Sequence, residues 1–89
     1  MILIIDISQE PALILKKGGK IIAEHSWPGL YQLDETLLIE IDKFLKKNKI
    51  GLKDIDKIKV RPSKKSLVST RITKAVALGL TPHLSRINF

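Results

Sequence analysis

Met1-Ile2-Leu3-Ile4-Ile5-Asp6-Ile7-Ser8 is the stretch that decides the fold. It is an apolar, β-branched run that ends in a carboxylate and a hydroxyl. Such a run is typical of a central β-strand. Successive side chains point to opposite faces, and both sets are apolar here, so both faces need cover. Ligands tend to bind at the carboxyl ends of strands in open sheets. Asp6 and Ser8 are therefore candidates for a phosphate or metal site, and a plain strand-end cap is the alternative.

The composition indicates one small domain. The chain has 89 residues and no cysteine, which excludes a disulfide framework and thiolate metal sites. The start lacks the features of a signal peptide, and no apolar run approaches the ~20 residues of a membrane span. We therefore expect a cytoplasmic protein that makes no use of a membrane.

The charge is concentrated in one segment. The net charge is +7, and ten of the sixteen basic residues lie between Lys43 and Lys65, where Asp54 and Asp56 are the only acids. This pattern fits tRNA or another polyanion, and it fits a solvated lysine face equally well.

The remaining chain reads as alternating strands and helices. Strands are predicted at 12–15 and 21–25 around a Gly18-Gly19 turn, at 57–60, and at 83–89. The first helix begins near Asp34 and the second runs from Ser66 or Leu67 to Leu80. The expected apolar stripe of the first helix is Leu37, Leu38, Ile41, Phe44 and Leu45, and that of the second is Val68, Ile72, Ala75, Val76 and Gly79.

The order βββαβαβ has a geometrical consequence. Parallel crossovers are right-handed, so the spatial order 3-2-1-4-5 places both helices on one face of a mixed five-stranded sheet. The opposite face then has no helix, although strands one and two are apolar on both sides. We infer that another subunit covers either this bare face or the helical layer.

Several single residues could bind a ligand or take part in catalysis, but each also has a purely structural explanation. His25 and His83 lack the spacing of metal ligands, so no metal or cofactor is predicted. Ser66 is expected to be a helix N-cap rather than a nucleophile. Trp27 is expected to pack over a sheet edge rather than to stack on a base. Arg71 either pairs with an acid across a helix interface or lies on the surface.

Three segments together resemble a known family. Met1 to Ser8 is similar to an opening strand of the type Ile-Leu-Ala-Ile-Asp-Thr-Ser in the TsaB (YeaZ) family of the actin-like ATPase superfamily. The residues from Asp34 to Ile58 match that family's first helix and its Leu-x-Asp-Ile/Leu-Asp-x-Ile connector without a gap. Ser66 to Ile72 falls where the family has Ser-Phe-Thr-Gly-Leu-Arg-Ile. The resemblance covers essentially all 89 residues and implies a single actin-like (ribonuclease H-like) α/β lobe.

The departures from the family concern its ligand site. Ser63-Lys64-Lys65 stands in place of a Gly-Pro-Gly loop, Leu33 replaces a histidine, and no second lobe is present in the 89 residues. Half a cleft can neither surround a nucleotide nor exclude water. We therefore expect no catalysis and no cofactor, and Asp6 and Ser8 would be a vestigial phosphate site.

The resemblance implies a non-catalytic subunit in the synthesis of threonylcarbamoyladenosine in tRNA. Its helices would pair with a TsaD-like partner or with a second copy in a dimer. The predicted interface residues are Leu38, Ile39, Asp42, Thr70, Arg71, Lys74 and Ala75. The predicted nucleic-acid contacts are Lys43, Lys46, Lys47, Lys49, Lys64 and Lys65. A stand-alone nucleic-acid-binding module and a decayed product without activity are the alternatives.

Overall fold

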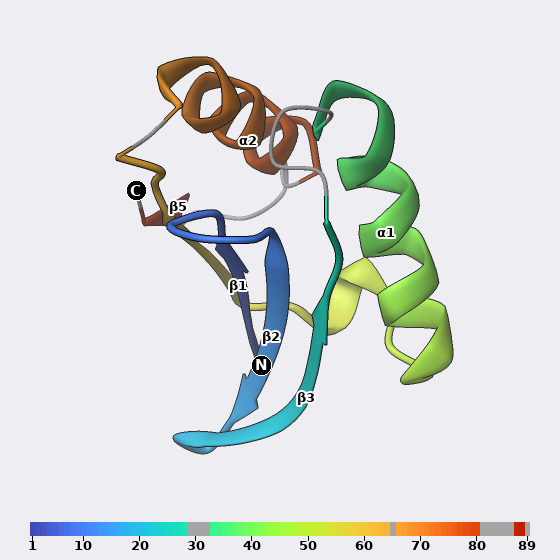
Figure 1. Ribbon diagram of the computed structural model, residues 1–89. Helices are drawn as coiled ribbons and strands as arrows, with labels where there is room; N and C mark the ends of the chain where they lie inside the picture. Colours follow the sequence, from blue (N-terminus) through green and yellow to red (C-terminus); the bar gives the residue numbers. More distant parts are fainter. Residues whose placement is uncertain (29–32, 65, 81–86, 89) are drawn as a thin grey trace.

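The computed structural model describes residues 1–28, 33–64, 66–80 and 87–88, with only the backbone at 33–35, 80 and 87–88. Figure 1 shows the order of the elements. Their bounds are β1 Ile2–Asp6, β2 Ala12–Lys17, β3 Lys20–Ser26, α1 Leu33–Lys47, η2 Leu52–Asp54, β4 Lys57–Arg61, α2 Leu67–Leu80 and β5 Ile87–Asn88. Neither helix in these ranges is long and apolar enough to cross a membrane.

The sheet is mixed, with β1 at its centre. β2 pairs antiparallel with β1 and β3, and β4 pairs parallel with β1, which gives the order β3-β2-β1-β4 predicted for the first four strands. The two residues of β5 pair in parallel with β4. The rest of the fifth strand predicted over 83–89 lies outside the described residues.

Turn chemistry connects these elements. Gly18 and Gly19 both have positive φ, at 59° and 80°, as the glycine turn between β2 and β3 requires. At the end of α1, Lys49 adopts a φ of 57°. The amides of Lys49 and Ile50 bond back to the carbonyls of Lys46 and Leu45, so α1 ends in a Schellman motif with lysine at the usual glycine position.

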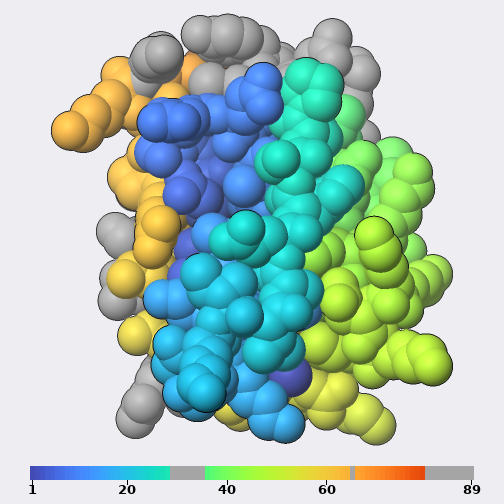
Figure 2. Space-filling model, turned by 60° about the horizontal axis from the view of Figure 1, so that its bottom comes forward, coloured from blue at the N-terminus to red at the C-terminus, as the bar shows by residue number. Residues whose placement is uncertain are grey.

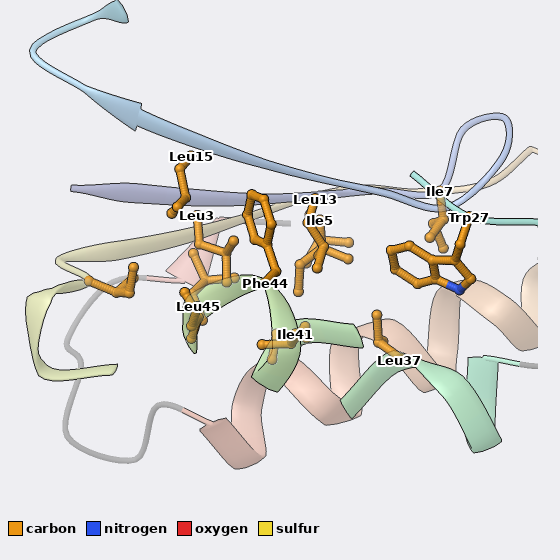
Figure 3. Packing of buried hydrophobic residues seen from close by; sticks show 14 residues of the cluster. Leu3, Ile5, Ile7, Leu13, Leu15, Trp27, Leu37, Ile41, Phe44 and Leu45 are labelled. Carbon is orange, nitrogen blue, oxygen red and sulfur yellow. The ribbon is translucent and has the colours of Figure 1, made fainter. Parts of the chain in front are cut away.

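The hydrophobic core lies between one face of the sheet and the two helices (Figure 3). α1 contributes Leu37, Ile41, Phe44 and Leu45, which repeat with helical spacing and are buried as predicted. Leu38 does not belong to this stripe, because its side chain is 55% exposed. The strands contribute Leu3, Ile5, Leu13, Leu15, Ile58 and Val60, and Ile7 directly follows β1.

α2 packs with a different face from the one predicted. Val68 is 65% exposed, and Ala75 and Gly79 are also exposed, whereas Ile72 and Val76 are partly buried. The buried side instead carries hydroxyls together with one small apolar residue. They are Ser69, Thr70, Thr73 and Ala77.

The buried hydroxyls of α2 bond to the backbone of the helix or to the loop that precedes it. Thr73 Oγ1 donates to the carbonyl of Ser69 at 2.9 Å, and Thr70 Oγ1 lies 3.2 Å from the carbonyl of Ser66. A hydroxyl that bonds to its own backbone is buried at little cost. This explains why a helix can hide threonine while its valine faces outward.

The opposite face of the sheet carries both lysines and isoleucines. The register places Lys16 and Lys57 on either side of Ile2, and Ile14 and Lys59 on either side of Ile4. Ile4 is only 1% exposed although no described helix lies on its side of the sheet. The prediction that no helix covers this face is thus confirmed for the described residues. Neighbouring side chains cover Ile4, whereas Ile21, opposite Lys16, remains 52% exposed.

Candidate functional site

Asp6 and Ser8 meet at the carboxyl end of β1, as predicted, and Arg61 joins them. Asp6 Oδ1 accepts hydrogen bonds from the amide of Ser8 at 2.9 Å and from its hydroxyl at 2.6 Å. Arg61 Nη1 donates to Asp6 Oδ2 at 3.3 Å. Both carboxylate oxygens are thus engaged by residues of the chain itself.

The surroundings of Asp6 keep it ionised. Partial burial would raise the pKa of this carboxyl, but the hydrogen bonds from Ser8 and the Arg61 guanidinium outweigh that effect and hold the pKa below its ordinary value. The result is an internally neutralised pair rather than a free anion waiting for a metal ion.

The cavity beside Asp6 does not suit a phosphate. Its lining includes Ser8, Gln9 and Ser26, but also the carboxylates of Asp6 and Glu10. Carboxylates repel a phosphate group. Nowhere in the described ranges do three acidic or histidine side chains gather closely enough to hold a metal ion.

Hydroxyls close the loop where the family has its glycines. The amide of Ser63 donates to Thr70 Oγ1 at 3.0 Å, and Ser63 Oγ accepts from the amide of Ser66 at 3.1 Å. Ser66 Oγ in turn accepts from the amide of Ser69 at 3.1 Å, so Ser66 is the N-cap of α2, as predicted. These amides serve the fold and do not point at a ligand.

His25 and Trp27 belong to the packing between β3 and α1. His25 Nε2 lies 2.7 Å from Glu40 Oε2, and the imidazole ring stacks between Trp27 and Phe44. Trp27 is 8% exposed and donates from Nε1 to Thr36 Oγ1 at 3.3 Å, which confirms its predicted packing role. His83 lies outside the described residues.

The outer side of the two helices carries exposed apolar side chains. On α1 these are the adjacent Leu38 and Ile39. On α2, Val68, Ala75 and Leu78 are exposed and follow one another at spacings of seven and three residues, which places them on one side of the helix. We call this set, with the exposed Leu67, the outer helical surface.

Most predicted interface residues lie on or beside the outer helical surface. Asp42 and Arg71 are exposed, Lys74 is half-buried, and Asp42 forms an ion pair with Lys46 at 3.0 Å. Thr70 is the exception, because it is 6% exposed and bonded to Ser63 and Ser66. It supports the α2 N-terminus and offers nothing to a partner.

The lysines predicted to contact nucleic acid do not form one patch. Lys46, Lys47 and Lys49 lie at the end of α1, whose connector joins the start of β1 through the bond from the Asp56 amide to the Met1 carbonyl. Lys64 follows the opposite end of β4, which is about 13 Å long. Lys65 lies outside the described residues.

Three groups escaped prediction. Arg61 lies beside Asp6 because β1 and β4 pair in that register; the predicted strand order makes these strands neighbours but does not give the register. Lys16 and Lys57 lie on the same sheet face because both pair with Ile2, which likewise cannot be predicted without the register. Leu78 was not singled out because it lies off the expected apolar stripe.

Comparison with known proteins identifies the fold. The structure superposes on YeaZ from Pseudomonas aeruginosa with a TM-score of 0.80 at 24% identity, over 98% of this chain and 41% of that one. An uncharacterized protein with similarity to peptidase YEAZ, also from Pseudomonas aeruginosa, gives 0.79 at 23% identity, with coverages of 98% and 41%. The fold is thus TsaB-like, and the chain spans about two fifths of the length of these structures. No family model and no curated protein matches the sequence.

Proposed function

We propose that the chain is a non-catalytic, cytoplasmic assembly subunit of the tRNA threonylcarbamoyladenosine system. It pairs through its outer helical surface with a TsaD-like protein or with a second copy of itself. The observation that carries this proposal is the exposure of large apolar side chains on both helices of a YeaZ-like fold. On α2 the exposed apolar groups share one side of the helix, and such a stripe is typical of a protein contact.

The state of the strand-end site supports a non-catalytic role. Arg61 and Ser8 already bind the Asp6 carboxylate. In the loop before α2, the amide of Ser63 donates to Thr70 Oγ1 and the amide of Ser66 donates to Ser63 Oγ. The amides of Ser63 and Ser66, in the part of the loop that the structure describes, are therefore not available to hold a nucleotide phosphate in the way that glycine-rich loops do. Binding, rather than chemistry, is what the exposed residues favour.

The apolar contribution to pairing is moderate. Five of the exposed side chains, each about half buried already, contribute roughly 4 to 7 kcal/mol when fully covered. They are Leu38, Ile39, Leu67, Val68 and Leu78. Association costs a similar amount in lost freedom, so pairing needs most of this surface. A charge placed in it should therefore abolish the complex.

The test is a double substitution, Leu38→Glu with Leu78→Glu, examined by light scattering coupled to size-exclusion chromatography. The measurement is made on the chain alone and after mixing with the TsaD-like protein of the source cell. We expect the unsubstituted chain to form a dimer or a mixed complex and the double variant to form neither.

Ile21→Glu with Ile22→Glu is the matched control, because these residues are equally exposed, at 52% and 50%, on the β2–β3 hairpin. The control should assemble like the unsubstituted chain. A chain that stays monomeric with every partner, or a control that fails equally, contradicts the proposal. Unchanged threonylcarbamoyladenosine in tRNA after deletion of the gene contradicts the pathway assignment.

A further inference from the structure

The open face of the sheet gathers three lysines from two strands. Lys16 on β2 and Lys57 on β4 flank Ile2, and Lys59 lies two residues farther along β4. Neighbouring strands are about 4.8 Å apart and alternate residues about 6.6 Å, so the three Cα atoms lie within about 12 Å. Figure 2 shows strands lying side by side at the surface, from β4 in yellow to β3 in cyan.

These three lysines are not committed to acids. Among the described residues, the ion pairs join Met1 to Asp56, His25 to Glu40, Lys46 to Asp42, and Arg61 to Asp6. Three acids lie near them in the described residues. Asp6 is neutralised by Arg61, Asp56 lines the same hollow as Lys16 and Lys57 and pairs with the Met1 ammonium, and Glu24 lies beside Ile14 on β3. Like charges held this close repel one another, which an anionic partner would relieve.

The surroundings of the lysines decide what kind of anion fits. Lys57 and Lys59 flank Ile2 and the buried Ile4, whereas the half-exposed Ile21 lies opposite Lys16 on the β3 side. An acidic helix of a partner protein centred on the two β4 lysines would therefore find little apolar surface to bury. No aromatic side chain lies among the strand residues of this face, so base stacking is not available. A regularly charged backbone needs neither feature and can contact all three ammonium groups.

We infer that the open sheet face, through Lys16, Lys57 and Lys59, binds the phosphate backbone of RNA without reading its sequence. This surface is separate from the outer helical surface, since the helices lie on the other side of the sheet. The inference does not depend on the proposed assembly function, and both surfaces can be occupied at once.

The test measures fluorescence anisotropy of a labelled RNA duplex against the full chain, between about 50 and 200 mM KCl. Neutralising three phosphates predicts a slope of log K against log salt of about −2.7. Lys57→Gln with Lys59→Gln should make that slope shallower by about 1.8 and weaken binding equally for duplexes of different sequence.

Lys43→Gln with Lys47→Gln is the matched control, because it removes the same charge from exposed positions on α1. The control should leave the slope unchanged, and circular-dichroism melts should show both variants folded. An equal or larger loss in the control, or the absence of RNA binding by the unsubstituted chain, overturns the inference. Displacement of RNA by polyglutamate as effectively as by unlabelled RNA also overturns it, in favour of an acidic protein partner.

Discussion

Replacing Ser66 by alanine tests how α2 is held, because two hydrogen bonds depend on this hydroxyl. Ser66 Oγ caps the helix by accepting from the amide of Ser69 at 3.1 Å, and it donates to Ser69 Oγ at 2.8 Å. Loss of an N-cap costs about 1 kcal/mol, and a buried hydroxyl–hydroxyl bond contributes about another 1. Ser66→Ala should therefore lower the free energy of unfolding by about 2 kcal/mol.

That loss is large for a domain of this size. The expected total stability of 89 residues is roughly 4 to 13 kcal/mol, and each kcal/mol shifts Tm by about 4 to 8 °C. A thermal melt followed by circular dichroism should thus show Tm lowered by about 8 to 16 °C. Ser26→Ala, on the exposed end of β3, is the control and should change stability by less than about 0.5 kcal/mol. If Ser66→Ala melts with the control, α2 is not capped as described.

Three further substitutions test other features by denaturant unfolding. Ile4→Ala should cost about 2 to 5 kcal/mol, as in a true core, and a loss below about 1 would show that the open face leaves Ile4 in water. Lys49→Gly should raise stability by about 1 kcal/mol, because glycine adopts the left-handed φ of 57° without strain; a loss would contradict the Schellman geometry. Asp6→Asn should cost about 1 kcal/mol at pH 7. Since the pKa of Asp6 is lowered in the folded state, its carboxylate stabilises the fold above about pH 4. The difference in unfolding free energy between the variant and the unsubstituted chain should vanish as pH falls through the folded pKa. A difference that does not depend on pH would refute the charged pairing.

Much of the fold could be predicted because apolar patterns fix it locally. The spacing of Leu37, Ile41, Phe44 and Leu45 determines which side of α1 packs against the sheet. Leu38 could not be placed from the pattern, because it is adjacent to Leu37 and a wide stripe would include both. Only the packed structure decides how far the stripe extends around the helix.

The buried face of α2 could not be found by counting apolar residues. Thr73 is completely buried, yet its hydroxyl is hidden by a bond to the Ser69 carbonyl, so its burial leaves no mark in the apolar pattern. The exposed Val68 then misleads in the opposite direction. Side-chain bonds to the helix backbone are a structural property that periodicity does not contain.

The strand-end site was found only in part. Asp6 and Ser8 were recognised by their position after the first strand, whereas Arg61 is 55 residues away and meets Asp6 through strand register. The predicted order of strands contained this pairing, but the exact register did not follow from the sequence. Asp6, which was expected to bind a ligand, is therefore half of a structural ion pair with Arg61.

The hydroxyl-lined contact of α2 has a consequence for the order in which the molecule opens. In the described core, Ala77 is the fully buried apolar side chain of α2. By contrast, α1 buries four large ones, Leu37, Ile41, Phe44 and Leu45. Detaching α2 therefore exposes less apolar area, so its local opening costs less free energy than that of α1 or β1. Fluctuations of the native state should begin at α2, the same helix that carries four of the six residues of the outer helical surface. A partner docked there would also suppress the easiest route to unfolding.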